Sequence, residues 1–222
     1  MADKTWRDVE DFINERFVAS DAALDAALEA SAAAGLPEIN VSPNLGKLLM
    51  LLAQAVGARK ILEIGTLGGY STIWLGRGLR ADGTLISLEA NEDYAAVARS
   101  NLARAGLAEK VEIRVGRAID TLPRLAGDAP FDLIFIDADK PMTPDYFQWA
   151  VTLSRPGSLI LVDNVVREGA VLDAESNDRN VQGIRRFYEL AAADPRVSAT
   201  ALQTVGGKGH DGIAILLVIS VP

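Results

Sequence analysis

Short apolar runs alternate with amphipathic stretches through the middle of the chain. Five runs have the length and the branched side chains of buried strands: KILEI at 60–64, TLISLE at 84–89, VEIRV at 111–115, FDLIFID at 131–137 and SLILVD at 158–163. The stretches between them have helical spacing or the length of a crossover connection. This alternation predicts an α/β fold in which five parallel strands form one sheet with helices on both faces.

The last third of the sequence departs from this alternation. A helical pattern at 178–193 is followed by VSATALQTV, a glycine-rich turn and DGIAILLVIS. Two strands joined in this way form an antiparallel hairpin. We therefore expect a Rossmann-like, doubly wound sheet of seven strands, mostly parallel, that ends in a C-terminal antiparallel hairpin.

The first 56 residues have a helical pattern. Ser20 is suited to cap a helix and Gly35 to end it, while Ser42 and Pro43 suit the cap and first position of the next helix. No linker or low-complexity tract marks a domain boundary. We expect a single domain over 1–222, in which the helices of 1–56 pack on the core.

Charge and composition narrow the class of partner. The chain has 22 Lys and Arg against 30 Asp and Glu, a net charge of −8, which disfavours general binding to nucleic acid or to an anionic membrane. A small-molecule partner fits better. Because the chain has no cysteine, a bound metal would need harder ligands, as in oxygen-ligated Mg, Ca or Mn sites. The sequence shows no secretion signal and no apolar stretch of membrane length, so we expect a cytoplasmic protein.

Acidic residues end four of the five predicted strands: Glu63, Glu89, Asp137 and Asp163. Ligands of doubly wound sheets bind at these strand ends. The turn EIGTLGGYS after the first strand lacks the spacing of a pyrophosphate loop and suits a nucleoside better than a dinucleotide. A carboxylate at Glu89 can accept both ribose hydroxyl protons. The alternative is that Glu63 and Glu89 only flank the next helix.

The ends of two neighbouring strands bring Asp137, Asp163 and Asn164 toward one point. Two carboxylates and an amide oxygen suit Mg or Ca. Lys140 lies on the same rim, and lysine can act as a general base where a neighbouring cation disfavours its charged form. The alternatives are that the acidic residues only stabilise turns and that Lys140 is an ordinary surface lysine.

A literal GxGxxG pattern occurs at Gly207, Gly209 and Gly212, but it lies between two strands and not before a helix. We interpret it as a hairpin loop. The only histidine, His210, falls in it and is expected to face solvent, whereas Asp211 and Gly212 could line a pocket.

Together these residues resemble the metal-dependent O-methyltransferases related to catechol O-methyltransferase and plant caffeoyl-CoA O-methyltransferase. The resemblance extends from about Val41 to the end and is most specific in ILEIGTLGGYS, in FIDADK at 135–140 and in LVDN at 161–164. It implies S-adenosylmethionine as cofactor, with a shell of Val41, Glu63, Gly65, Thr66, Gly69, Ser71, Glu89, Ala118, Asp137 and Asp139. It also implies a divalent metal, Mg before Mn or Ca, on Asp137, Asp163 and Asn164, with Lys140 and Asp137 as the catalytic pair.

The resemblance further implies a homodimer and methyl transfer to a hydroxyl of a small catechol-like or phenolic acceptor, with the helices of 1–56 contributing to the acceptor site. Glu168 stands where the plant enzymes carry a substrate-contacting asparagine, which argues against a bulky CoA ester. Tyr146 and Trp149 are interpreted first as core aromatics and second as walls of the pocket.

Three other functions stay open. A tRNA hydroxyuridine O-methyltransferase of the same family would need a local basic patch, for example from Arg77, Arg80, Arg114 and Arg117. A nicotinamide dehydrogenase is supported only by the fold and by Glu89. A non-catalytic nucleoside-binding module would keep the Glu63 to Glu89 half of the site and lose the metal half.

Overall fold

The computed structural model describes residues 4–19 and 21–220 and contains the predicted seven-stranded sheet. The strand order is β3-β2-β1-β4-β5-β7-β6. The first five strands pair in parallel, and β7 pairs antiparallel with both β5 and β6. The strands are β1 (Lys60–Ile64), β2 (Thr84–Glu89), β3 (Val111–Val115), β4 (Phe131–Ile136), β5 (Ser154–Asp163), β6 (Val197–Gly206) and β7 (Gly209–Val218). The predicted fold class is confirmed.

The sheet reverses its winding between β1 and β4. These strands pair from Ile61 with Leu133 to Ile64 with Ile136, although 66 residues of sequence separate β1 from β4. The backbone N–H of Asp137 continues the ladder by donating to the Ile64 carbonyl oxygen, at 2.9 Å. The loops that follow β1 and β4 are therefore neighbours at the switch point, where doubly wound folds bind ligands.

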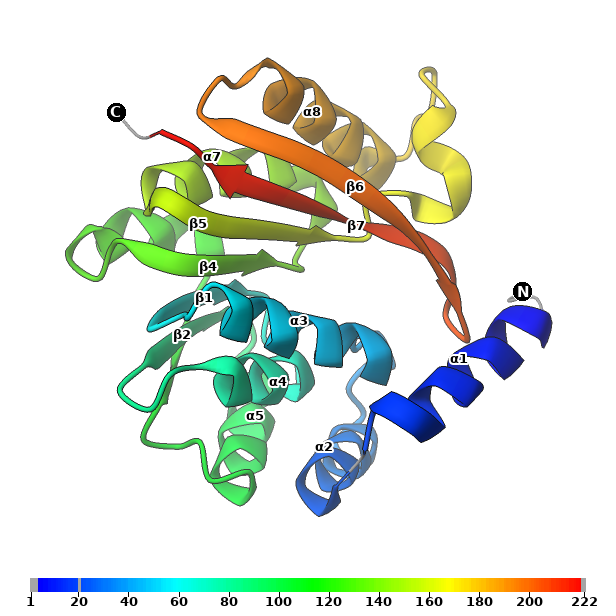
Figure 1. Cartoon of the computed structure of the whole chain (residues 1–222), viewed down its shortest axis with the longest axis vertical. Coiled ribbons are helices and arrows are strands. Elements are labelled where there is room, and N and C mark those ends of the chain that lie inside the picture. Colours follow the sequence, from blue (N-terminus) through cyan, green and yellow to red (C-terminus); the bar gives the residue numbers. More distant parts are fainter. Residues whose placement is uncertain (1–3, 20, 221–222) are drawn as a thin grey trace.

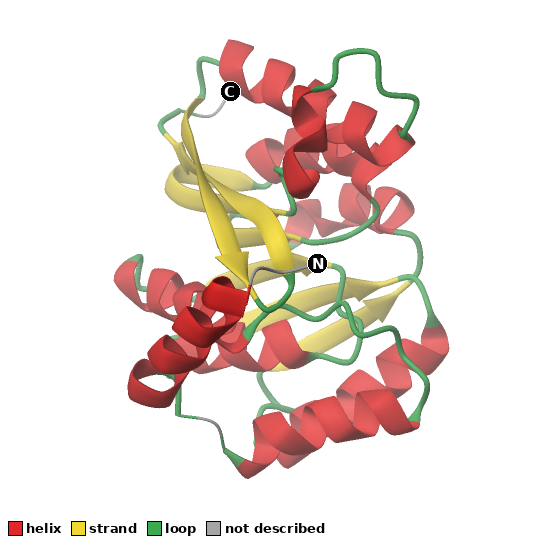
Figure 2. Cartoon of the chain, turned by 90° about the vertical axis from the view of Figure 1, so that its right-hand side faces the viewer, coloured by secondary structure: helices red, strands yellow, loops and turns green. Residues whose placement is uncertain are grey.

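Helices cover both faces of the sheet (Figures 1 and 2). Alternate strand residues belong to different cores: Ile61 packs in the cluster under the helices of the first half, and Leu62 packs in the cluster under α7 and α8. The helical elements are α1 (Lys4–Phe17), α2 (Ala22–Ala33), α3 (Pro43–Ala55), α4 (Tyr70–Gly78), α5 (Glu92–Arg104), α6 (Ala118–Thr121), α7 (Thr143–Thr152) and α8 (Arg179–Ala193), with the 3-10 segments η1 (Leu122–Gly127), η2 (Lys140–Met142) and η3 (Arg167–Leu172).

The predicted ends of the two helices are confirmed at Gly35, Ser42 and Pro43, and the cap predicted for the first helix is corrected. Ser42 caps α3, with Pro43 in its first position, and Gly35 follows α2 with a φ of +71°. The cap of α2, however, is Asp21, whose carboxylate accepts the N–H groups of Ala23 and Leu24 at 3.0 and 3.1 Å. Ser20 lies outside the described residues.

The C-terminal hairpin is tighter than predicted. Its turn consists of Gly207 and Lys208 alone, and Gly206 pairs with Gly209. His210 is therefore a strand residue, opposite Val205, and its Nε2 lies 2.7 Å from the side-chain oxygen of Gln203. The absence of a following helix confirms that the GxGxxG pattern is not a pyrophosphate loop.

The helix α1 lies beside the tip of this hairpin (Figure 1), although nearly 200 residues of sequence separate them. The carboxylate of Glu10 accepts the N–H of Gly207 at 2.6 Å, and the ring of Trp6 lies 6.3 Å from that of His210. None of the helices in the described ranges is long and apolar enough to cross a membrane.

Candidate active site

A cavity of about 1060 Å³ opens at the carboxyl ends of the parallel strands, where the fold predicts a ligand. Its volume can hold a nucleoside cofactor together with a small second ligand. Ten of the predicted site residues line it: Val41, Gly65, Thr66, Ser71, Glu89, Ala118, Asp137, Asp139, Lys140 and Asn164. The other three, Glu63, Gly69 and Asp163, are buried directly behind residues that do.

The loop after β1 lies very close to the loop after β4. Gly65 has a φ of +102°, and a Cβ atom on it would lie 2.0 Å from the carbonyl oxygen of Asp137. Only glycine fits here, because both the backbone conformation and the space exclude a side chain. The glycine turn thus brings the backbone of the predicted cofactor loop against the predicted metal and base residues.

Glu63 supports this loop from below. The residue is fully buried and accepts hydrogen bonds from Ser71 Oγ at 2.6 Å, Thr72 Oγ1 at 2.5 Å and Ser87 Oγ at 2.6 Å. Burial raises the pKa of Glu63 to about 7, because the lost hydration outweighs the three hydrogen bonds. Glu63 therefore positions Ser71 and the start of α4, which agrees with the helix-flanking alternative.

Glu89 both lines the cavity and fixes the backbone around it. One carboxylate oxygen accepts the N–H of Leu67 at 2.8 Å, and the other accepts the N–H of Asn91 at 2.9 Å. Each oxygen keeps a further lone pair, which leaves the carboxylate able to accept hydroxyl protons from a ribose. The two interpretations of Glu89 are thus compatible.

Tyr146 on α7 combines the two roles considered for it. Its ring packs in the core, its side chain lines the cavity, and its hydroxyl donates a hydrogen bond to Asp139 Oδ1 at 2.6 Å. Burial, followed by the hydrogen bond to Asp139 and then the negative charge of Asp139, raises the pKa of Tyr146, so the hydroxyl stays a donor at neutral pH. Trp149 packs against the core and does not line the cavity.

Asp137, Asp163 and Lys140 form a charged cluster at the end of β4 and β5. Lys140 Nζ lies 2.8 Å from Asp137 Oδ1, and both Lys140 and Asp163 are buried. Burial and then the charge of Asp137 raise the pKa of Asp163 to about 7, against the opposing effect of Lys140. With both carboxylates ionised, the cluster has more negative than positive charge in a largely desolvated place.

This excess of negative charge fits a divalent cation with oxygen ligands. Among residues 4–19 and 21–220, no third acidic, histidine or cysteine side chain joins the two carboxylates in a metal-binding group. A third protein ligand would be the amide oxygen of Asn164, which lines the cavity and whose backbone has a φ of +60°. The donor set of two carboxylates and one amide suits Mg, Mn or Ca.

The loop after β5 is held in an unusual backbone conformation by Asp211. Arg167 and Glu168 both have left-handed φ values, of 56° and 55°. Such residues cost roughly 1–3 kcal/mol each and persist where the surroundings over-determine them. Asp211 Oδ1 accepts the N–H groups of Val166 and Arg167, both at 3.0 Å, and its own neighbour's N–H at 2.9 Å. Asp211 therefore organises the edge of the cavity without lining it.

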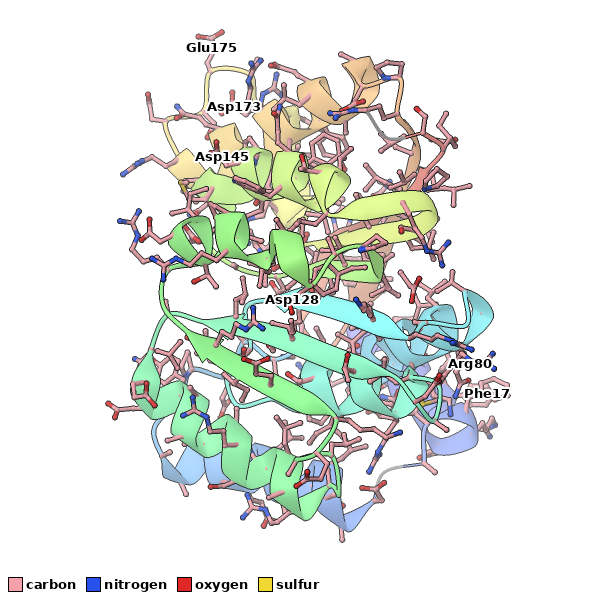
Figure 3. The ribbon with its side chains drawn as sticks, turned by 90° about the vertical axis from the view of Figure 1, so that its left-hand side faces the viewer. Phe17, Arg80, Asp128, Asp145, Asp173 and Glu175 are labelled. Atoms are coloured by element: carbon pink, nitrogen blue, oxygen red, sulfur yellow. The ribbon has the colours of Figure 1, made fainter. Side chains whose placement is uncertain are left out.

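The four arginines considered for a nucleic-acid patch do not form one. Three of them lie in ion pairs with carboxylates: Arg77 with Asp21, Arg114 with Glu112 and Asp128, and Arg117 with Asp120. The fourth, Arg80, lies at one edge of the molecule, away from Asp128 (Figure 3). The structure gives no support to the tRNA alternative.

The sequence did not indicate several of the residues that line the cavity. The segment 36–40 before Val41 forms one wall, and Arg167 and Lys208 contribute cationic side chains. Arg167 could have been predicted as a lining residue, because it lies three residues after Asn164, just beyond the end of a predicted strand. Lys208 gave no signal, because its position depends on contacts between segments far apart in the sequence.

A family model described as O-methyltransferase matches residues 15–218. The chain is 52% identical over 220 residues to the catechol O-methyltransferase of Niastella koreensis, with 98% of this chain and 100% of that protein covered. It is 54% identical over 211 residues to the catechol O-methyltransferase of Mycobacterium tuberculosis, with 95% of each covered.

Solved structures agree with these matches. The O-methyltransferase from Bacillus cereus in complex with SAH superposes with a TM-score of 0.95 and 57% identity, over 97% of this chain and 99% of that chain. TomG from Streptomyces achromogenes, an O-methyltransferase involved in tomaymycin synthesis and bound to SAM, gives 0.96 and 50%, over 99% and 100%. These findings exclude the dehydrogenase and the non-catalytic module. The chain therefore belongs to the O-methyltransferase family of S-adenosylmethionine-dependent enzymes.

Proposed function

We propose that this enzyme transfers the methyl group of S-adenosylmethionine to a hydroxyl of a small catechol-like acceptor, and that it uses a divalent cation, Mg first, to do so. The observation that carries the proposal is the cluster of Asp137, Asp163 and Lys140. It combines a buried and a partly buried carboxylate with one lysine, at the wall of a cavity that the glycine loop after β1 also lines. The names of the two catechol O-methyltransferase relatives support the acceptor class.

The residues divide into a cofactor side and an acceptor side. On the cofactor side, Glu89 is placed to accept the ribose hydroxyl protons, and the Gly65 to Gly69 loop lets the cofactor approach the backbone. Asp139 lines the cavity and is held by Tyr146 through one carboxylate oxygen, and its other oxygen would accept a hydrogen bond from an amino group. On the acceptor side, Asp137, Asp163 and Asn164 would hold the cation.

Methyl transfer forms the bond between the acceptor oxygen and the methyl carbon as the carbon–sulfur bond breaks. The bond electrons stay on sulfur, which becomes a neutral thioether. Asp137, Asp163 and Asn164 would hold a divalent cation, whose positive charge would favour an ionised acceptor hydroxyl. Lys140, at the same wall, would take up the hydroxyl proton after releasing its own ammonium proton. Holding both substrates in line supplies much of the remaining rate enhancement.

The test is transfer of labelled methyl from S-adenosylmethionine to catechols, hydroxycinnamates and flavonoids, with Mg or with EDTA. We expect labelling of vicinal diols that EDTA abolishes, and loss of this activity in Asp163→Ala. Glu175→Ala is the matched control, because Glu175 projects from an exposed loop (Figure 3). Metal-dependent turnover that survives in folded Asp163→Ala would contradict the assigned ligand, and EDTA-resistant labelling would contradict the metal.

The homodimer and the cytoplasmic location stay predictions. Light scattering coupled to gel filtration tests the first: a mass near 47 kDa, about twice the 23.6 kDa of one chain, is expected for a homodimer.

A further inference from the structure

Two cationic side chains line the cavity but have no role in the proposed methyl transfer. Arg167 lines the cavity beside Asn164, and its Nε is buried without a hydrogen-bond acceptor in the described part of the chain. Lys208 lines the same cavity from the turn of the C-terminal hairpin. No carboxylate among the described residues forms an ion pair with either one. Buried donors are nearly always satisfied, so an unsatisfied guanidinium nitrogen indicates a missing partner.

Lys208 is fixed in place from two sides. Its Nζ donates a hydrogen bond to the carbonyl oxygen of Asn40, in the segment that forms one wall of the cavity. The preceding residue, Gly207, donates its N–H to Glu10 of α1. The turn is therefore anchored to the N-terminal segment, and the ammonium group is held at the wall. Its remaining N–H groups can donate hydrogen bonds to a ligand.

The rest of the hairpin brings Lys208 toward the segment of Arg167. Gly209 follows Lys208 directly, and a Cβ atom on it would lie 3.5 Å from the carboxylate of Glu168. Asp211, two residues further along β7, holds the backbone N–H of Arg167 at 3.0 Å. The two cations therefore come from adjacent segments on the β5 side of the cavity, which is the acceptor side.

The electrostatic surroundings favour a monoanion at this place. Desolvation lowers the pKa of Lys208, whereas the negative charges of Asp137, Asp163, Glu10 and Glu38 act to raise it. These carboxylates would repel a phosphate dianion more strongly than a carboxylate. The third cation nearby, Lys140, is already paired with Asp137. A planar carboxylate matches the fork of an arginine and can receive a further hydrogen bond from a lysine.

We propose that Arg167 and Lys208 bind a carboxylate of the methyl acceptor, so that the preferred acceptor is a catechol carrying a carboxylic acid, such as a dihydroxybenzoate or a dihydroxycinnamate. The inference rests on the proposed catechol methylation and adds the second functional group of the substrate. Arg167 and Lys208 act in recognition of the acceptor, not in transfer of the methyl group.

The experiment compares kcat and KM for 3,4-dihydroxybenzoate, its neutral amide and catechol, in the presence of Mg. The enzymes are the wild type, Arg167→Met, Lys208→Met and Lys208→Arg, with Arg124→Met as the charge-removal control at an exposed cation outside the cavity. Wild type should prefer the acid to the amide by about tenfold in kcat/KM, as one hydrogen-bonded charge pair provides. The Met variants should lose this preference through KM alone, and Lys208→Arg should restore it.

Each contrary result has its own meaning. Equal losses for the acid, the amide and catechol would show that Arg167 and Lys208 only maintain the structure, and would overturn the inference. A higher KM for S-adenosylmethionine with every acceptor would assign the two cations to the carboxylate of the cofactor instead, and would also overturn it. Turnover of the amide with no acid preference in wild type overturns the inference while leaving the proposed function intact. No turnover of any diol, with or without Mg, overturns both.

Discussion

The backbone of α8 at Gly183 packs directly against the turn that carries Lys140. A Cβ atom on Gly183 would lie 2.2 Å from the carbonyl oxygen of Lys140 and 2.7 Å from the Cα of Pro141. These are backbone atoms, so a side chain at this position cannot be accommodated by rotation of a neighbour. The glycine allows a helix from the last third of the chain to support the proposed base.

Gly183→Ala is therefore expected to displace Lys140 and to lower kcat by about tenfold or more, since small misplacements of reacting groups cost rate steeply. The clash of the new Cβ atom should lower the free energy of unfolding. The higher helix propensity of alanine, about 1 kcal/mol over glycine, offsets part of this loss. Steady-state kinetics and thermal unfolding check the two effects. Gly127→Ala is the matched control, because a Cβ atom on Gly127 would meet nothing within 4 Å. An unchanged kcat in Gly183→Ala would contradict the supporting role.

Tyr146→Phe removes the hydroxyl that holds Asp139. A hydrogen bond to a charged group contributes about 1.5–3 kcal/mol, so the affinity for S-adenosylhomocysteine should fall by about tenfold or more. Titration calorimetry measures it. The control is Tyr188→Phe, whose half-buried ring forms no hydroxyl hydrogen bond found within the described ranges. Equal affinities in wild type and Tyr146→Phe would show that Asp139 needs no positioning.

Glu63 makes the stability of the protein depend on pH. Its pKa is raised in the folded state to about 7, from 4.5, so the folded state binds the proton more tightly than the unfolded chain. The corresponding stability is fully present below pH 4.5 and is lost as the pH rises through 7. At pH 8 the loss amounts to roughly 3 kcal/mol.

Glu63→Gln should abolish this part of the pH dependence. Urea unfolding at pH 5, 6, 7 and 8 measures it, as the difference between wild type and variant at each pH. The raised pKa of Asp163 acts in the same direction and is present in both proteins, so it cancels from the difference. A constant difference across this range would mean that Glu63 does not take up a proton near neutrality.

Asp211→Ala removes the acceptor of three backbone N–H groups and leaves Arg167 and Glu168 without support for their left-handed conformation. We expect a loss of about 1–3 kcal/mol in the free energy of unfolding and a higher KM for the acceptor, with the KM of the cofactor unchanged. Asp173→Ala serves as control, since within the described ranges the exposed Asp173 side chain accepts a single backbone N–H, that of Glu175. A rise in the KM of both the acceptor and the cofactor would show that Asp211 supports the whole fold and not the acceptor side alone.

The sequence was sufficient to predict the parallel sheet and the polar strand ends that line the cavity. Residues such as Glu89, Asp137 and Asn164 follow buried strands, and the ends of parallel strands meet at one edge whatever the details of packing. The sequence predicted a hairpin but not which residues form its turn, because several glycines in GGKGHDG permit φ values suited to a turn. Ser20 and Asp21 are both good helix caps, so the sequence could not decide between them.

The residues that were missed depend on tertiary contacts. Tyr146 was considered as a wall of the pocket, but no periodicity reveals its hydrogen bond to Asp139. Lys208 reaches the cavity because α1 and Asn40 hold the hairpin turn, across more than 160 residues of sequence. Such contacts leave no local pattern that a single sequence can show.

The two sides of the cavity are built from different kinds of structure. The proposed cofactor side consists mainly of loops fixed by the register of β1, β2 and β4, whereas the proposed acceptor side consists of the 36–40 segment, the Asn164 to Glu168 connection and the hairpin turn at Lys208. Insertions and substitutions are tolerated far better in connections than in buried strands. On this proposal, a different compound can become the methyl acceptor through changes to a few side chains in three connections, while the strands that position the methyl donor keep their sequence.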